Sequence, residues 1–375
     1  MSLSGEQMLR VLHLIYNWGK GGFESYVCSL TERLHNRECE FYAGYSERVP
    51  MPELVEKLGI RTFHIPMTSP YDFAAAKKVA AICREYSIDA VHTHFVRERY
   101  IAAISRLMGN DAKLVYTSHV VVEKTPLLKL ANRIVNRIED NIIAVCNAGR
   151  EQMLSEGLDP RKIAVIHNGV DAGFWEEGVG STIRQEYGIG EDAFVITTTG
   201  RFNEEKGHRF LLEAACKLKG LMRERRDVKY KFLLAGDGEL LEGCKRQAVD
   251  AGISEDVVFT GFRSDIRNIL HGSDLYASPS KTEALSMSII EALACALPVV
   301  ATDVGGTGEV INDRNRCGLL VPYGDSDAFA SAVARLMLDK PLYEEYKANA
   351  RETAGKKFNL DKTALETYNL YKRRR

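Results

Sequence analysis

The chain has 375 residues, which at about 150 residues per domain predicts two domains of ordinary size. Its residues are 45% hydrophobic, 27% charged and 9% aromatic, a composition that excludes disordered, collagenous and small disulfide-stapled proteins. Lys and Arg number 50 against 51 Asp and Glu, so no global charge attracts the chain to nucleic acid. Any anion that it binds must be held by a local group of residues.

Short apolar runs alternate with longer segments of helical period through the first half, a pattern typical of β-α-β units around a parallel sheet. The expected strands are Met8–Ile15, Cys39–Ala43, Arg61–Ile65, Ala90–Thr93, Lys113–Thr117, Asn141–Cys146 and Lys162–Ile166. The expected helices are Phe23–Leu34, Pro52–Leu58, Phe73–Glu85, Arg99–Met108, Leu127–Ile138 and Ala148–Glu156.

The same alternation begins again after residues 176–189, where apolar periodicity lapses and glycines gather. The expected strands are Phe194–Thr199, Lys231–Ala235, Val257–Thr260, Leu275–Ser278, Val299–Ala301 and Gly318–Val321, with helices between them. The tail from Pro341 is helical, with an expected break at Gly355 and a last helix over Leu360–Tyr371. We therefore expect an α/β protein with domains at 1–175 and 190–357, a hinge at 176–189, and a C-terminal helix within 358–375 that packs on the first domain.

The eight cysteines are scattered singly and form no C-x-x-C pair, which favours a reducing compartment and no structural zinc. The longest apolar stretch, Ile289–Ala301, is interrupted by Glu291 and Pro298 and is too short to span a bilayer. We expect a cytoplasmic protein, or one attached to the inner face of the cell membrane.

A glycine-rich segment follows the first expected strand, at Gly19, Lys20, Gly21 and Gly22. Backbone amides at the start of a helix can approach an anion there, although such a loop also occurs merely as a tight turn. The first strand of the second half leads into a loop that carries Arg201 and Lys206. The carboxyl end of a strand is where ligands bind in open α/β sheets, and two cations there suit a diphosphate. The alternative is that both are ordinary surface charges.

Glu283 and Glu291 are separated by seven residues, with the second inside an apolar helical pattern. The first can project beside the helix start while amides near Ser286–Ser288 point at an anion. The alternative is a capping Glu followed by an unrelated helical Glu.

Six motifs follow one another along the chain: G-G-F-E at 21–24, V-I-H-N-G-V-D at 165–171, G-R-F-N-E-E-K-G at 200–207, A-G-D-G at 235–238, the Glu283/Glu291 pair, and V-G-G at 304–306 followed by Glu309. In this order they resemble family 4 retaining glycosyltransferases, and the resemblance covers nearly the whole chain. The resemblance implies a GT-B fold, that is, two Rossmann-like domains whose parallel sheets face each other across a cleft, with closure about the hinge. It implies transfer of a hexose or N-acetylhexosamine from a nucleotide-diphosphate sugar, with UDP expected, to a hydroxyl of a glycan or lipid-linked acceptor in cell-envelope or exopolysaccharide synthesis.

Site roles follow from the resemblance, residue by residue. Arg201 and Lys206 would hold the donor diphosphate, Glu291 the ribose hydroxyls, Glu283 the sugar hydroxyls, and His119 the sugar near the reacting centre. Gly22 would approach the phosphates or acceptor, Arg263 would lie near the base, and Leu285, Ser286 and Met287 would line the donor pocket. No cofactor and no metal are expected, since there is no D-x-D triplet and the two cations and helix amides can supply the positive charge.

Two departures from the common family pattern stand out. Ala284, Leu285 and Ser286 replace the usual Phe and Gly after the first Glu, which bears on sugar specificity. Ala296 stands where Gly usually precedes the Pro, at a cost of about 1 kcal/mol if that position needs a positive φ.

A local basic excess lies between Arg97 and Arg137, with eight Lys or Arg and three Asp or Glu. Within it, Leu127–Ile138 predicts a basic amphipathic helix that either lies on an anionic bilayer or packs its apolar face on its own sheet. Two other functions also fit the motifs: a GT-B nucleotide-sugar epimerase, which needs no acceptor, and a non-catalytic subunit that binds sugar nucleotides.

Overall fold

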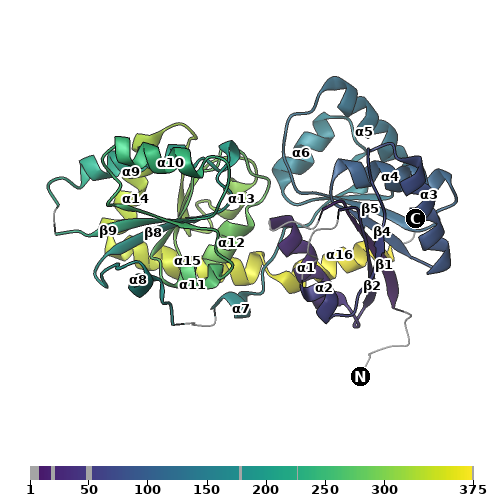
Figure 1. Cartoon of the computed structure of the whole chain (residues 1–375), viewed down its shortest axis with the longest axis horizontal. Coiled ribbons are helices and arrows are strands. Elements are labelled where there is room, and N and C mark those ends of the chain that lie inside the picture. Colours follow the sequence, from purple (N-terminus) through teal and green to yellow (C-terminus); the bar gives the residue numbers. More distant parts are fainter. Residues whose placement is uncertain (1–7, 18–21, 48–52, 177–179, 226, 374–375) are drawn as a thin grey trace. The chain divides into compact units, whose positions relative to one another are not determined.

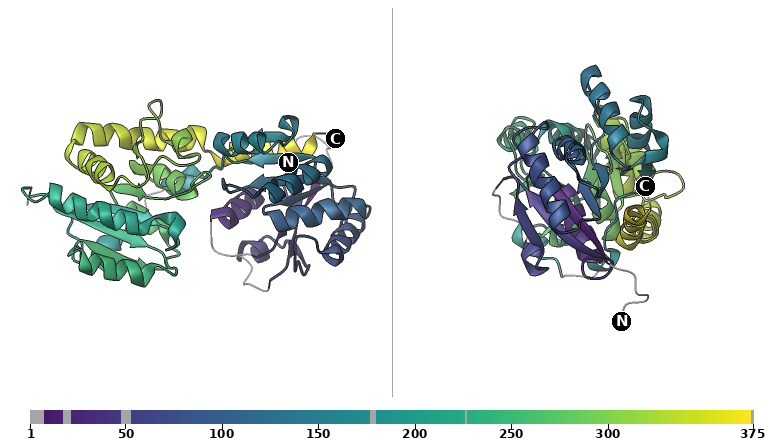
Figure 2. Two further views of the ribbon diagram at one scale, coloured as in Figure 1. Left: turned by 90° about the horizontal axis from the view of Figure 1, so that it is seen from above. Right: turned by 90° about the vertical axis from the view of Figure 1, so that its right-hand side faces the viewer.

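The computed structural model describes residues 8–17, 22–47, 53–176, 180–225 and 227–373. The chain divides into two compact units, Met1–Gly169 with Leu360–Arg375, and Val170–Asn359. Each unit is a parallel sheet with helices on both faces (Figure 1 and Figure 2). The segment 176–189, expected to be the hinge, belongs to the second unit, because the chain passes from one unit to the other at Gly169–Val170.

The first unit contains a seven-stranded sheet of order β3-β2-β1-β4-β5-β6-β7. Its strands are β1 Leu9–Ile15, β2 Cys39–Tyr45, β3 Arg61–His64, β4 Ala90–Thr93, β5 Lys113–Ser118, β6 Asn141–Ala144 and β7 Ile163–Val165. Its helices are α1 Gly22–Leu34, α2 Glu53–Lys57, α3 Phe73–Glu85, α4 Val96–Leu107, α5 Pro126–Ile138, α6 Asn147–Ser155 and the C-terminal α16 Leu360–Lys372.

The second unit contains a six-stranded sheet of order β10-β9-β8-β11-β12-β13. Its strands are β8 Phe194–Thr199, β9 Tyr230–Ala235, β10 Val257–Gly261, β11 Leu275–Ser278, β12 Val299–Thr302 and β13 Gly318–Val321. Its helices are α7 Ala172–Glu176, α8 Ile183–Glu186, α9 His208–Leu221, α10 Leu241–Asp250, α11 Ile266–His271, α12 Met287–Ala294, α13 Thr307–Val310, α14 Ser326–Leu338 and α15 Lys340–Lys357. All the strands expected from the sequence are therefore present in both units.

Alternation along the strands builds the two core layers of each sheet. In β1, Val11 and Ile15 pack with α1 and α16, whereas Leu12 and Leu14 pack with α3 and α4. In the second unit, Ile196 packs beneath α9 and α14, and its neighbour Val195 packs with α8 and α11 on the other face. Strands buried on both faces explain why the apolar runs in the sequence are continuous.

The helical tail departs from the sequence expectation at one point. Helix α15 continues through Gly355 and ends at Lys357, so the expected break at Gly355 is wrong. A helix tolerates one glycine at a cost of about 1 kcal/mol, and the chain turns instead at Phe358 and Asn359.

Helix α16 belongs to the first unit although it follows the second in sequence. It packs on α1, and Lys113 Nζ donates to the carbonyls of Leu370 (2.5 Å) and Arg373 (2.7 Å) at its end. Tyr371, which is also on α16 and is buried, forms a hydrogen bond through its hydroxyl with His92 Nδ1 of β4. These contacts place the last helix as part of the first unit's core.

Each sheet changes direction once in its strand order. The chain moves outward on one side from β1 and on the other from β4, and likewise from β8 and β11. Ligands of open α/β sheets bind beyond the carboxyl ends of the strands at this point. Among the described helices, none combines the length and apolar character needed to cross a bilayer.

Candidate active site

In the second unit, the loops that follow β8 and β11 meet at the switch point of the sheet. The loop after β8 carries Arg201 and Lys206, and the loop after β11 carries Glu283. The Lys281 amide donates to the Glu205 carbonyl over 2.7 Å, so the two loops are joined through their backbones as well.

Lys206 and Glu283 form an ion pair at the centre of this loop pair. Lys206 Nζ donates to Glu283 Oε1 over 2.6 Å, and Ser280 Oγ donates to the same oxygen over 2.8 Å. Burial opposes the charge of Lys206, but the Glu283 carboxylate more than offsets it, and the pKa of Lys206 is raised. Lys206 is therefore a fixed cation at neutral pH.

Hydroxyl groups line the pocket that contains this ion pair. Its walls are Thr198, Thr199, Lys206, His208, Tyr276, Ser278, Pro279, Ser280, Glu283 and Ser286. Thr199 Oγ1 and the Tyr276 hydroxyl lie 3.1 Å apart and share a hydrogen bond. A lysine with several hydroxyl donors is a chemical environment suited to phosphate or sugar oxygens.

His208 is a second polar group buried at this pocket. Its ring stacks on Phe202 at 3.8 Å between centroids, and neither ring nitrogen has a hydrogen-bond partner among the described residues. Burial and the nearby Lys206 charge lower the pKa of His208 to about 4, so the ring is neutral at pH 7.

Two glycines allow the loops to approach so closely. A Cβ on Gly207 would lie 2.0 Å from the Pro279 carbonyl oxygen, and one on Gly305 would lie 1.7 Å from the Glu283 carbonyl oxygen. Both glycines have a positive φ, of 66° and 54°. The G-R-F-N-E-E-K-G and V-G-G motifs therefore shape the backbone around Glu283.

Helix α12 begins at the other side of Glu283. Leu285, Ser286 and Met287 are buried at its start, where Ser286 is the N-cap residue and leaves the first amides without a side-chain cap from its own hydroxyl. Helix amides of this kind can bind an anion. Glu291 lies about one turn into the helix, and burial raises its pKa to about 7.

The remaining cations differ in their surroundings. Arg201 is exposed, and the described part of the chain gives its guanidinium no ion pair. Arg263 follows the edge strand β10 and is held by Asp265 at 2.7 Å, by Glu186 and by the Tyr187 hydroxyl. These contacts do not bring Arg263 to the Lys206–Glu283 pair, and they occupy both of its terminal nitrogens.

In the first unit, His119 follows β5 and belongs to a group of histidines. His94 Nδ1 lies 3.2 Å from His119 Nε2, and His13 Nδ1 lies 3.0 Å from His94 Nε2. His92 bonds the Tyr371 hydroxyl and Thr117 Oγ1, each over 2.7 Å. Burial lowers the pKa of His13 and of His119 to about 3, so these rings are neutral.

The nitrogens of His13, His92 and His94 lie within 4.8 Å of one another, which makes these three residues a geometric candidate for a metal ion. Both nitrogens of His92 already have oxygen partners, and the ring contact of His13 with His94 is accounted for as a hydrogen bond. The geometry is explained without an ion.

Gly22 is the first residue of α1, after β1 at the switch point of the first sheet. The preceding residues 18–21 of the glycine-rich loop lie outside the described residues.

Sequence reasoning missed several members of these sites. Ser280 and His208 stand within quoted or adjacent motifs, but nothing in their spacing reveals that they face Glu283 and the pocket. The joining of His13, His94 and His119 depends on the adjacency of β1, β4 and β5, which the order of elements along the chain does not state.

Comparison with known families covers most of the chain in two parts. The family profile described as Glycosyl transferases group 1 matches residues 180–353, and that described as Glycosyltransferase Family 4 matches residues 20–174.

Two relatives illustrate the sequence similarity. The N-acetyl-alpha-D-glucosaminyl L-malate synthase of Bacillus anthracis is 26% identical over 309 residues, covering 80% of this chain and 79% of that protein. The UDP-Gal:alpha-D-GlcNAc-diphosphoundecaprenol alpha-1,3-galactosyltransferase of Escherichia coli is 26% identical over 357 residues, covering 91% and 90%.

Solved structures share the fold. A glycosyltransferase from Rickettsia africae superposes with a TM-score of 0.85 at 23% identity, covering 98% of each chain. Anabaena HepE in complex with UDP superposes with a TM-score of 0.85 at 21% identity, covering 96% of this chain and 99% of that one. The expected GT-B fold is thereby confirmed.

Proposed function

Since the chain belongs to the family 4 glycosyltransferases, we propose that it transfers a hexose or N-acetylhexosamine from a UDP sugar to a hydroxyl group with retention of anomeric configuration. The single observation that carries this proposal is the Lys206–Glu283 ion pair in a hydroxyl-lined pocket at the switch point of the second sheet. It joins a phosphate-binding cation to a carboxylate that can accept hydrogen bonds from a sugar.

Lys206, Arg201 and the start of α12 would bind the donor's diphosphate. The fixed charge of Lys206 and the amides after Ser286 would stabilise the negative charge that develops on the leaving diphosphate. Exposed Arg201 is available to neutralise the outer phosphate. These groups together supply the charge that a divalent cation would otherwise provide, so we propose a metal-independent reaction, for which undiminished turnover in EDTA is the test.

Two carboxylates and one imidazole would bind the donor's hydroxyl groups. Glu291 would accept hydrogen bonds from the ribose diol, Glu283 from the sugar, and His119 would contact the sugar near the reacting carbon. The acceptor hydroxyl would attack on the face that the leaving group departs from, with a phosphate oxygen as base. No protein nucleophile is needed in this scheme.

Further residues predicted from the sequence are also proposed for the donor site. Leu285, Ser286 and Met287 remain proposed wall residues of the donor pocket, and Gly22 a proposed backbone contact. Arg263 is the weakest assignment, because its guanidinium is held by two carboxylates that a nucleotide base would have to compete with.

Three relatives support UDP and a glycan or lipid-linked acceptor. Anabaena HepE is solved with UDP and with UDP-glucose, and the Escherichia coli relative is named for UDP-Gal and a diphosphoundecaprenol acceptor. A Campylobacter jejuni relative, 26% identical over 301 residues, is likewise named for a diphospho-undecaprenol acceptor. We therefore propose a role in cell-envelope or exopolysaccharide synthesis.

The test is a nucleotide-sugar screen followed by product analysis. Thermal stabilisation identifies the donor, because a bound ligand raises the apparent stability by mass action. Sugar transfer to added acceptors is then measured for wild type and Lys206→Ala. We expect transfer with wild type and a loss of orders of magnitude in the variant, whereas isomerised donor without transfer would indicate an epimerase instead.

Helix α5 exposes part of its apolar surface, which supports a membrane-facing role. Its buried face carries Asn132 and Asn136, while Leu127, Leu130 and Ile134 are exposed, at 78%, 54% and 53%. Val135 is buried as well and packs, with Leu128, Ala131 and Ile138 beside it, against Tyr100 and Ala103 of α4. Part of the apolar face therefore packs on the protein, whereas Leu127, Leu130 and Ile134 do not.

A buried polar network joins α5 to α4 and to the residue that follows it, Glu139. Arg99 pairs with Glu139 at 2.6 Å and donates to Asn132 over 3.0 Å, and Asn136 donates to Glu139 over 3.0 Å. These contacts hold the buried polar side chains of α5 on the protein, while Leu127, Leu130 and Ile134 remain exposed.

We propose that this exposed face inserts shallowly into an anionic bilayer at the cytoplasmic face of the membrane, with Lys129, Arg133 and Arg137 on the same helix attracted to the headgroups. Flotation with vesicles that contain anionic lipid should carry wild type upward and leave a Leu127→Ser, Leu130→Ser double variant behind. The matched control is Leu221→Ser, an equally exposed leucine on α9 of the other unit. Flotation of neither protein, or of both equally, would discard the membrane proposal.

A further inference from the structure

Three imidazole rings contact one another in series from the interior of β1 to the carboxyl end of β5. His13 Nδ1 lies 3.0 Å from His94 Nε2, and His94 Nδ1 lies 3.2 Å from His119 Nε2. The rings of His13 and His94 are stacked, as are those of His94 and His119, with centroids 5.2 Å and 5.4 Å apart. His13 and His94 are almost fully buried, and His119 is partly exposed.

Neighbouring groups hold the middle of the series in place. His92, whose centroid lies 4.5 Å from that of His94, is fixed through both ring nitrogens by Thr117 and Tyr371. The Tyr26 ring meets His119 edge-on, with centroids 5.2 Å apart. The His94 ring therefore has little freedom to turn away from its two partners.

Because each ring is neutral, each carries a hydrogen on one nitrogen only. Two consecutive ring-to-ring hydrogen bonds then require all the hydrogens to point the same way along the series. Either His13 donates to His94 and His94 donates to His119, or both donations run in reverse. The first direction places the His119 hydrogen on Nδ1, and the second places it on Nε2.

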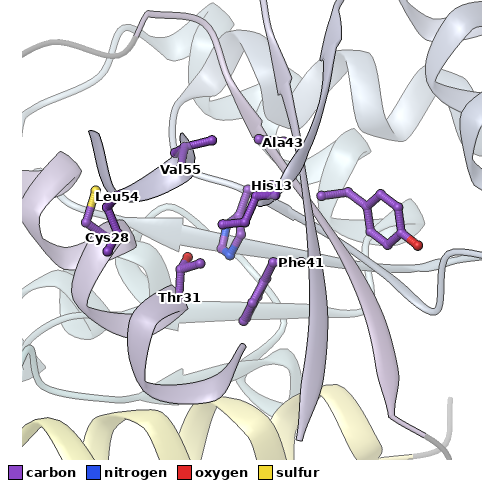
Figure 3. A pocket seen from close by; sticks show the side chains of 9 residues that line it. His13, Cys28, Thr31, Phe41, Ala43, Leu54 and Val55 are labelled. Atoms are coloured by element: carbon purple, nitrogen blue, oxygen red, sulfur yellow. The ribbon is translucent and has the colours of Figure 1, made fainter. Parts of the chain in front are cut away.

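The inner end of the series favours the first direction. His13 Nε2 has no hydrogen-bond partner among the described residues, and His13 lines a small cavity with Thr31, Phe41 and other mostly apolar residues. Figure 3 shows the His13 ring in this cavity beside Thr31 and Phe41. In this cavity an unpaired N–H costs more than an unpaired acceptor nitrogen, so the bare Nε2 of the first direction is favoured.

We propose that His13 and His94 are positioning residues that fix His119 as the tautomer with its hydrogen on Nδ1, so that His119 donates a hydrogen bond to a hydroxyl oxygen of the donor sugar. This inference rests on the proposed function, which assigns His119 to the donor sugar. His94 acts only through His119, and His13 acts only through His94.

Two substitutions of His94 separate its two contacts. An Asn side chain ends near the place of Nδ1, so His94→Asn keeps a partner for His119 and loses the contact with His13. A Gln side chain reaches the place of Nε2, so His94→Gln keeps the contact with His13 and leaves His119 without its partner. His64→Gln, at an exposed histidine of β3 whose ring bonds the Ser46 carbonyl, is the matched control.

The first readout is the tautomer of His119, measured by ¹⁵N NMR of the histidine rings in the full chain and assigned with His119→Gln. Wild type and His64→Gln should show the hydrogen on Nδ1, and His94→Gln should shift His119 toward the Nε2 tautomer. A wild-type His119 with its hydrogen on Nε2 would overturn the proposal even where a variant fails to fold.

The second readout is turnover with a UDP sugar. We expect His94→Gln to lower kcat at least tenfold with a donor KM within threefold of wild type, and His94→Asn to retain most of kcat. Equal losses in the two variants, or no loss in either, would refute the positioning of His119 by His13 and His94. Full activity of His119→Ala would instead refute the role of His119 in the proposed function. This result distinguishes a failure of the proposed function from a failure of the positioning of His119 by His13 and His94.

Discussion

Lys206 and Glu283 lie 77 positions apart in the chain, yet Lys206 Nζ donates to Glu283 Oε1 over 2.6 Å. The two loops that carry them follow β8 and β11, the strands on either side of the switch point. A diphosphate is an alternative partner for the ammonium group, and a sugar hydroxyl is an alternative partner for the carboxylate. Donor binding can thus exchange the partners of both side chains without leaving either charge unpaired in the pocket.

The backbone around Glu283 depends on Gly305. Gly305→Ala should reduce turnover at least tenfold, because the new Cβ would lie 1.7 Å from the Glu283 carbonyl oxygen and would displace that residue. Gly252→Ala is the matched control, since Gly252 has a similar φ of 66° with nothing within 4 Å of its Cβ position.

Gly252→Ala should lose about 1–2 kcal/mol of stability and keep wild-type turnover. Denaturant unfolding and turnover measured on both variants separate the left-handed backbone cost from the clash. Equal turnover in Gly305→Ala and wild type would show that the position of Glu283 does not matter for the reaction.

Much of the fold was predictable because buried parallel strands leave continuous apolar runs. The runs at Phe194–Thr199 and Leu275–Ser278 coincide with β8 and β11 residue for residue. The helix break expected at Gly355 was wrong because glycine weakens a helix without ending it, and α15 continues to Lys357.

The site was predictable only as far as its residues share a motif. Lys206 was expected on a loop at the end of a strand and Glu283 beside the start of a helix, but their direct contact requires the order of β8 and β11 in the sheet. Arg263 shows the opposite limit, because its two carboxylate partners, Glu186 and Asp265, lie in segments with no motif that marks them as its partners.

Ala296 carries a backbone conformation that suits glycine. Its φ is 60° and its side chain is buried. The position therefore has the positive φ under which an alanine in place of glycine is expected to cost stability. Ala296→Gly should stabilise the protein by about 0.5 kcal/mol, because relief of about 1–2 kcal/mol of left-handed strain exceeds the roughly 0.8 kcal/mol lost with the buried methyl group.

The matched control for this change is Ala292→Gly inside α12, which should destabilise the protein by about 1 kcal/mol or more. Urea unfolding of both variants measures the two free energies. Destabilisation of the same size in both would contradict the strain at Ala296.

If Glu291 holds the donor ribose as proposed, donor binding should depend on pH. Burial raises its pKa to about 7, and only the carboxylate accepts hydrogen bonds from both ribose hydroxyls. The donor KM should therefore rise as the pH falls below 7, by up to about tenfold per pH unit. The Glu291→Gln variant should bind more weakly at pH 8 and lose this pH dependence, whereas the same slope in the variant would exclude Glu291 as its source.

The buried histidines should make the first unit sensitive to acid. Burial lowers the pKa of His13 and His119 to about 3, so the unfolded chain binds protons at these rings below pH 6.5 and the folded chain does not. Their contribution to stability is complete above pH 6.5 and is lost as the pH falls toward 3, at up to about 1.4 kcal/mol per ring and pH unit. Glu98 and Glu291 act in the opposite sense, because burial raises the pKa of each carboxyl.

A His13→Phe variant tests this account of acid stability. Removal of one ring that titrates only on unfolding should make the free energy of unfolding fall less steeply between pH 6.5 and 3. His64→Phe at an exposed position should leave the slope unchanged. An unchanged slope in His13→Phe would contradict the burial of a neutral ring at that position.

The most direct test of the proposed donor site is calorimetric titration of UDP into the full chain. Wild type should bind UDP, Lys206→Ala should bind at least tenfold more weakly, and Lys217→Ala should bind as wild type does, because Lys217 is an exposed α9 residue paired with Asp327 outside the pocket. UDP binding of equal strength in wild type and Lys206→Ala, or no binding of UDP to wild type, would contradict the assignment of this pocket to a UDP-sugar donor.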